Sequence, residues 1–197
     1  AAAHVCPNRV RTFEAIGVDL VIGRREGYRF WDVDGHELLD FHLNGGVFNL
    51  GHRNPELVAT LRDALDTLDV GNHHFPSAAR ADLAEALVKT MPGDLAYVVF
   101  APSGGEAIEV AIKTARHATR RRKIVSIAKG YHGHTGLALA AGDERFSKLF
   151  LSEGEPGLFV QVPFNDLEAM ESALSGGDVA AVLMEPAMCN AGANTRL

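Results

Sequence analysis

The sequence predicts an α/β protein in which an N-terminal antiparallel meander and a helix lead into a mostly parallel sheet flanked by helices. One observation is the Asp34-Gly35 pair between two strand-like runs, a strong hairpin signal. Another is the alternation of strand-like and helix-like segments from Leu95 onward, which is typical of parallel sheets covered by helices. The 197 residues, 47% of them hydrophobic, suffice to bury one sizeable core. The meander and linking helix fall in residues 1–70 and the parallel sheet in residues 71–197.

The N-terminal elements follow from turn signals and periodicity. Three strands are predicted, at Val18 to Ile22, Tyr28 to Val33 and Glu37 to Phe41, with turns at Gly23 to Gly27 and at Asp34-Gly35. Asn54 and Pro55 predict a helix start, because asparagine is a good N-cap and proline fits the first helical position. The apolar residues of this helix recur at helical spacing, at Leu57, Val58, Leu61, Leu65 and Leu68. A second helix is predicted from Ser77 to about Thr90.

In the second half, three strand-like runs each end in polar residues. The first run, Tyr97 to Phe100, is followed by Ser103-Gly104-Gly105-Glu106-Ala107 and a helix-like run from Ile108 to His117. The second, Lys123 to Ile127, is followed by Gly130-Tyr131-His132-Gly133-His134-Thr135. The third, Val179 to Met184, is followed by Glu185-Pro186. Parallel strands direct their carboxyl ends to one edge of the sheet, where ligands bind. We therefore expect these polar residues to converge in one crevice.

The Ser103-Gly104-Gly105 segment has the features of a phosphate-binding site. The first turn of a helix presents unpaired amides and the positive end of the helix dipole, and glycine leaves room for the phosphate. A glycine turn between a strand and a helix also occurs without any ligand. Here Tyr131 adds an aromatic face and Glu185 a carboxylate, so the set suits a flat, phosphorylated, cationic ring.

Together these motifs resemble those of the class III, pyridoxal-phosphate-dependent aminotransferases of fold type I. The segments Gly27 to His36 and Gly51 to Pro55 also resemble that family's aromatic-Asp-x-Asp-Gly hairpin and its Gly-His-x-x-Pro helix start. The resemblance extends over roughly residues 14–194. It implies that residues 71–197 are the first part of the family's large cofactor-binding domain, incomplete at the C-terminus.

The resemblance implies pyridoxal 5'-phosphate as the cofactor and assigns roles to individual residues. The implied cofactor-binding residues are Ser103, Gly104, Gly105, Tyr131, His132 and Glu185, and the implied substrate-side residues are Asn44, Gly45 and Val47. Tyr131 would stack on the cofactor ring, whereas His132 would have a structural or supporting role. Glu185 would lie near the ring's phenolic oxygen or the substrate. Gly105 departs from the family, where most members have threonine or serine, so only backbone amides would bind phosphate there.

The implied reaction transfers an amino group between an amino acid or amine and a keto acid or aldehyde, and the implied assembly is a homodimer. The partners would be a small-molecule amino donor and a keto acceptor. An aminomutase or racemase on the same scaffold would carry the same motifs, and Asn190 gives residues 185–192 a likeness to the glutamate-semialdehyde aminomutase branch. The alternative from a different functional class is a catalytically inactive fragment or an interaction module.

The family also has a lysine that forms a Schiff base with the cofactor and an aspartate that pairs with its pyridine nitrogen, and neither motif occurs in this sequence. The lysines present are Lys89, Lys113, Lys123, Lys129 and Lys148. None falls in a segment that resembles the Schiff-base motif, so no catalytic residue is assigned. We expect the chain to be the N-terminal portion of a larger enzyme and to be inactive alone.

Composition excludes several other functions. The net charge of -6 and the pI near 5.8 argue against nucleic acid as a partner, and the apolar runs are too short for a membrane span. Cys6 and Cys189 lie far apart, which makes a disulfide framework unlikely and favours a reducing, cytoplasmic location. The paired His73 and His74 have no carboxylate or cysteine at ligand spacing, so no metal is expected.

Overall fold

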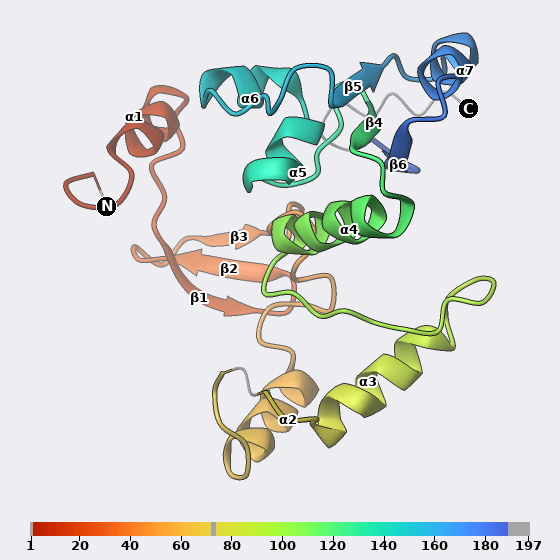
Figure 1. Cartoon of the computed structure of the whole chain (residues 1–197). Coiled ribbons are helices and arrows are strands. Elements are labelled where there is room, and N and C mark those ends of the chain that lie inside the picture. The colour runs from red at the N-terminus through yellow and green to blue at the C-terminus, as the bar shows by residue number, and fades with distance from the viewer. Residues whose placement is uncertain (1, 72–73, 189–197) are drawn as a thin grey trace. The chain divides into compact units, whose positions relative to one another are not determined.

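The computed structural model describes residues 2–71 and 74–188 and divides the chain into two compact units, Ala1–Phe75 and Pro76–Leu197 (Figure 1). The predicted α/β class is confirmed, with antiparallel strands in the first unit and a parallel sheet with helices in the second. Within the described residues, no helix is both long enough and apolar enough to cross a membrane.

The first unit contains the predicted meander, with its first strand displaced. Its elements are α1 (Pro7–Ala15), β1 (Ile22–Glu26), β2 (Arg29–Asp32), β3 (Glu37–Leu39) and α2 (Pro55–Leu65). The prediction of a strand at Val18 to Ile22 was wrong, because the charged segment that was expected to be a turn forms β1. Arg24 stacks its guanidinium 3.6 Å from the centre of the Trp31 ring, so a charged residue is accommodated on this exposed ribbon. The turn moves to Gly27-Tyr28, where Glu26 pairs with Arg29.

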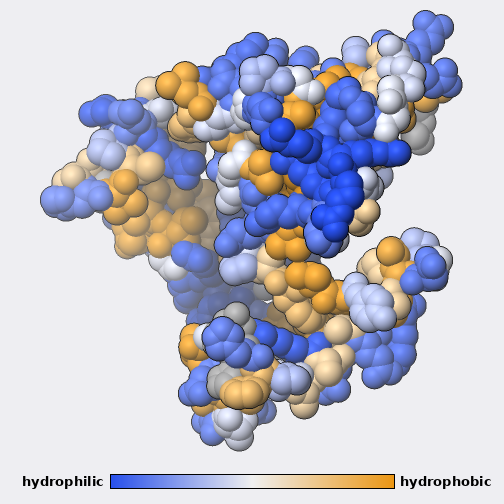
Figure 2. Space-filling model, in the orientation of Figure 1, coloured by the Kyte–Doolittle hydropathy of each residue, from blue (hydrophilic) through white to orange (hydrophobic). Residues whose placement is uncertain are grey.

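The helix start at Asn54 is confirmed in atomic detail. The Asn54 side-chain oxygen accepts hydrogen bonds from the backbone nitrogens of Glu56 and Leu57, and Pro55 is the first helical residue. The leucines that recur along α2 are nevertheless exposed in the described structure: Leu57, Leu61 and Leu65. Figure 2 shows such hydrophobic residues, in orange, at the molecular surface.

The second unit alternates helices and strands as predicted. Its elements are α3 (Ala78–Val88), α4 (Gly104–Thr119), β4 (Lys123–Ile127), α5 (Gly136–Ala141), α6 (Glu144–Leu149), β5 (Phe159–Val162), α7 (Leu167–Leu174) and β6 (Val179–Leu183). β4 lies between β5 and β6 and pairs with both in parallel, so that Val125 is opposite Val160 on one side and Val182 on the other. The carboxyl ends of β4 and β6 therefore share one edge of the sheet.

Alternate residues of β4 build two core clusters, one on each face of the sheet. Val125 and Ile127 pack with Val162, Met188 and the apolar side of α7. Ile124 packs with Ile112 of α4 and Ala141 of α5 on the opposite face. Successive side chains of a strand point to opposite faces, so β4 is covered on both sides of the sheet. The packing of α4 on one of these faces holds this helix against the strand that leads to Tyr131.

The predicted strand at Tyr97 to Phe100 is wrong for the described structure. These residues pair with none of the described strands, and Tyr97 is 95% exposed. Apolar, β-branched composition favours a strand only where a neighbouring strand supplies hydrogen bonds and packing. α4 is consequently preceded by a segment that pairs with none of the described strands.

Candidate functional site

The site begins at the first turn of α4, which Ser103 caps. The Ser103 hydroxyl oxygen accepts from the backbone nitrogen of Glu106 at 3.2 Å and donates to the Glu106 carboxylate at 2.8 Å. This arrangement is a variant of the capping box, because the carboxylate bonds the serine hydroxyl rather than the serine backbone. The cap fixes the helix start, and the free first-turn amides next to it attract an anion.

The two glycines of this turn differ in their surroundings. A Cβ built on Gly104 would meet no atom within 4 Å, so the space over this residue is open. A Cβ on Gly105 would lie 3.2 Å from the Thr135 hydroxyl oxygen, and a Cβ on Gly133 would lie 2.6 Å from the Gly105 Cα. Gly133 also has a φ of +121°. Glycine is therefore required at position 133 because two backbones meet there.

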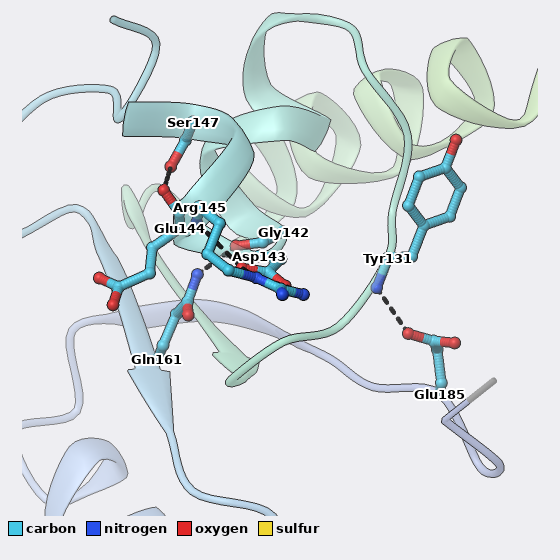
Figure 3. Close-up of polar contacts among 8 residues, drawn as sticks. All are labelled: Tyr131, Gly142, Asp143, Glu144, Arg145, Ser147, Gln161 and Glu185. Carbon is cyan, nitrogen blue, oxygen red and sulfur yellow. Dashed lines mark hydrogen bonds and ion pairs between the residues drawn. The ribbon is translucent and has the colours of Figure 1, made fainter. Parts of the chain in front are cut away.

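The segment after β4 places Tyr131 beside this turn, and Glu185 holds it. The Tyr131 backbone nitrogen donates to Glu185 Oε1 at 2.6 Å, while the ring points away from the carboxylate (Figure 3). The ring contacts His134 edge-on, with centroids 5.3 Å apart. Tyr131 is 43% exposed, so one aromatic face is available. Glu185 thus connects the end of β6 to the segment that follows β4.

His132 is buried in the same segment, and its Nε2 atom has no hydrogen-bond partner among the described residues. Burial lowers its pKa below the ordinary 6.5, and the nearby Glu185 carboxylate opposes this only in part. The imidazole is accordingly neutral near pH 7, which suits a supporting role more than an anion-binding one.

A pocket of about 710 Å³ brings the predicted cofactor residues together, except Glu185. It is lined by Ser103, Gly104, Gly105, Ile108, Tyr131, His132, Gly133, His134 and Thr135. Glu185 joins the site through its bond to Tyr131. Sequence reasoning assigned no role to Gly133 or Thr135. The Gly-x-Thr spacing after a strand was visible, but only the contact with Gly105 shows its importance.

A polar corner beyond α5 stabilises the base of this site. Asp143 is buried, and its carboxylate accepts from the backbone nitrogen and the guanidinium of Arg145, the shortest contact being 2.6 Å (Figure 3). Its own backbone nitrogen donates to the carbonyl of Gly130 at 2.9 Å. The Gln161 side chain bonds the carbonyl of Gly142 from β5. These bonds hold α5, α6 and the residue before Tyr131 in one arrangement.

We expect Asp143→Asn to lower the free energy of unfolding by about 1 kcal/mol at neutral pH, a modest value because Arg145 is largely exposed. The bonds from Arg145 hold the pKa of Asp143 below its ordinary 3.8. The wild-type advantage should therefore be complete above pH 3.8 and disappear as the pH falls through the lower, folded-state pKa. Urea unfolding at several pH values measures this, with the exposed Glu171→Gln as control. A difference that does not shrink as the pH falls below 3.8 would contradict the role of the carboxylate charge.

The predicted substrate-side residues lie in the first unit. Asn44 lines a pocket of about 520 Å³ together with residues of the meander, whereas Gly45 and Val47 do not line it. The turn that carries them is left-handed: Leu43, Asn44, Gly45 and Gly46 all have positive φ. The Asp40 carboxylate fixes its start by accepting from the Leu43 nitrogen at 2.8 Å. The role of Asn44, Gly45 and Val47 toward substrate stays a prediction.

One group of side chains in the described structure has metal-ligand geometry, namely Asp32, Asp34 and His36 in the first unit. The Asp32 carboxylate already accepts from the backbone nitrogens of Asp34 and His36 and bonds the His36 ring. The bond to His36 lowers the pKa of Asp32. These hydrogen bonds account for the hairpin geometry without a metal. Of the paired histidines considered above, His73 lies outside the described residues, as does Asn190.

Comparison with known proteins gives a consistent set of relatives. The family model for class III aminotransferases matches residues 13–196. An uncharacterized aminotransferase of Archaeoglobus fulgidus is 57% identical over 92% of this chain and 42% of its own length. A glutamate-1-semialdehyde 2,1-aminomutase of Sulfurihydrogenibium azorense is 35% identical over 93% of this chain and 44% of its own.

A solved structure of taurine:2-oxoglutarate aminotransferase from Bifidobacterium kashiwanohense, in complex with PLP and glutamate, resembles the fold with a TM-score of 0.76 at 28% identity. The match covers 90% of this chain and 47% of that one. The chain therefore spans less than half the length of the relatives it matches.

Proposed function

Because the chain belongs to the class III aminotransferase family, we propose that the pocket at the start of α4 binds pyridoxal phosphate. We further propose that the whole protein transfers an amino group between an amino acid or amine and a keto acid or aldehyde. The observation that carries the proposal is the pocket itself, in which the open, capped start of α4 and the exposed Tyr131 face lie side by side. When bound, the cofactor supplies an electron sink for carbanion chemistry.

The residues of the pocket fit the phosphate and the ring separately. Gly104 leaves the start of α4 open, and the amides of Gly104 and Gly105 are among the first-turn donors that have no partner within the helix. Tyr131 would supply an aromatic face for the pyridine ring of the cofactor. Glu185 acts as a positioning residue, because its Oε1 is committed to the Tyr131 backbone.

The lysines of this chain have no part in the proposed chemistry. No lysine is among the described residues that line the pocket. Three of the five are engaged in ion pairs elsewhere: Lys89, Lys123 and Lys148. We propose that the proton transfer of the reaction depends on a group other than these lysines, so the 197-residue chain has no transaminase activity by itself.

The substrate class and assembly are also proposals. We propose an amino donor and a keto acceptor as substrates, with Asn44, Gly45 and Val47 bordering their channel. The aminomutase relatives favour an aminomutase as the second candidate. We also propose a homodimer, which the exposed leucines along α2 support. A cytoplasmic location is proposed as well, and the exposed free thiol of Cys6 is compatible with it. The division of the chain near Phe75 supports an N-terminal segment of residues 1–70 followed by the cofactor domain.

We expect Tyr131→Ala to weaken pyridoxal phosphate binding by about two- to tenfold, the equivalent of one aromatic contact. Absorbance titration of the full-length protein with pyridoxal phosphate measures the dissociation constant. Tyr131→Phe serves as the control: it keeps the ring and loses only the long contact, 3.4 Å, between the hydroxyl and His134. Binding that is unchanged in Tyr131→Ala would remove the ring from the proposed site.

A further inference from the structure

Thr135 occupies the N-cap position of α5 without capping it. A threonine at this position ordinarily accepts a hydrogen bond from the second or third helical amide. The Thr135 side chain makes no such bond. Its hydroxyl oxygen is buried and has no hydrogen-bond partner among the residues that the structure describes. A buried hydroxyl without a partner is costly, so this one calls for an explanation.

Glu109, from the middle of α4, takes over the capping bond. Its Oε1 atom accepts from the backbone nitrogen of Ala138, the third residue of α5, at 3.0 Å. The carboxylate lies 3.9 Å from the point where a Cβ on Gly136 would stand. The start of α5 is thus satisfied by a neighbouring helix, and the Thr135 hydroxyl is left for another partner.

The location of Thr135 indicates which partner. Its hydroxyl oxygen lies 3.2 Å from the Cβ position of Gly105, and the residue lines the same pocket as Gly104 and Gly105. Gly133 makes this proximity possible, because it lets the segment approach the first turn of α4 backbone to backbone. Thr135 is itself partly exposed, and threonine has more than one staggered χ1 rotamer, so its hydroxyl is not confined to the Gly105 side.

We propose that Thr135 donates a hydrogen bond to the phosphate group held at the start of α4, and that Glu109 is the positioning residue that frees it from capping α5. Gly105 has no side-chain donor, and Thr135 supplies one from the neighbouring segment. The proposal rests on the proposed function, since it specifies the partner of the phosphate in that pocket.

The test compares binding of pyridoxal phosphate with binding of pyridoxal, which lacks the phosphate, by absorbance titration of the full-length protein. Thr135→Val keeps the shape and removes the hydroxyl. We expect it to weaken pyridoxal phosphate binding about tenfold and to leave pyridoxal binding unchanged, whereas Thr135→Ser should retain wild-type affinity. Equal binding of pyridoxal phosphate by Thr135→Val and wild type would overturn the role of Thr135 alone. Absence of binding by the wild type would overturn the proposed function with it.

Glu109 variants test the second half of the proposal. Glu109→Ala should let Thr135 return to the Ala138 nitrogen and weaken pyridoxal phosphate binding as Thr135→Val does, whereas Glu109→Gln keeps an oxygen acceptor and should bind normally. The double variant Glu109→Ala/Thr135→Val should bind no more weakly than Thr135→Val alone. Fully additive losses, or equal losses for pyridoxal, would overturn the positioning role.

Discussion

Gly133→Ala is expected to lower the free energy of unfolding by about 2–4 kcal/mol and to abolish the pocket. The new Cβ would stand 2.6 Å from the Gly105 Cα, a contact with backbone that no side-chain rotation relieves. The positive φ of 121° adds strain for any residue with a Cβ. The segment from Tyr131 to Thr135 would have to move off α4, so pyridoxal phosphate binding should be lost together with stability.

Gly157→Ala is the matched control for this change. Gly157 has a φ of +77° in the same unit, and a Cβ there would meet no atom within 4 Å. Gly157→Ala therefore introduces backbone strain without a close contact, and this strain should lower the free energy of unfolding by about 1–2 kcal/mol. Urea unfolding and absorbance titration of both variants separate the two effects. Equal losses of stability in the two variants would show that the close approach of positions 105 and 133 is unimportant.

The second large effect is expected for Gly104→Val, which should lose cofactor binding while keeping its stability. The space over Gly104 is open, so the protein itself accommodates the side chain and the free energy of unfolding should change by less than about 1 kcal/mol. The same side chain fills the position through which a phosphate approaches the helix start. We therefore expect pyridoxal phosphate binding to fall by about 100-fold or more.

Ala107→Val is the control for Gly104→Val, because it places the same side chain on an exposed position of α4 that does not line the pocket. Its affinity for pyridoxal phosphate should be that of the wild type. Gly104→Ala should give an intermediate loss. If Gly104→Val and Ala107→Val bind pyridoxal phosphate equally well, the phosphate does not lie at the start of α4.

Local patterns predicted most of the fold because they encode local geometry. Asn54-Pro55 marks a helix start whatever surrounds it, and the apolar run from Lys123 to Ile127 is buried on both faces as its composition indicates. The displaced first strand and the unpaired Tyr97 to Phe100 segment were missed for one reason. In both cases the outcome depends on pairing with a neighbour, such as Arg24 on Trp31, which no local pattern contains.

The site was predictable to the extent that sheet topology places polar residues at one edge. Tyr131 and Glu185 follow β4 and β6 and meet for that reason. Ser103 and Gly104 line the pocket with Tyr131 although the segment before them pairs with no described strand. The contacts that shape the pocket were not predictable, because they join segments distant in sequence: Gly105 with Gly133, and Glu109 with Ala138. Each of these depends on the packing of α4 against α5, and none has a distinctive residue spacing.

Amide chemical shifts of the full-length protein, recorded by NMR during titration with pyridoxal phosphate and separately with pyridoxal, would locate the phosphate. We expect pyridoxal phosphate to shift the amide resonances of Gly104 and Gly105 most strongly and pyridoxal to leave them nearly unchanged, while both compounds affect Tyr131. Shifts that spare Gly104 and Gly105, or that are the same with and without the phosphate, would contradict the placement of the phosphate at the start of α4.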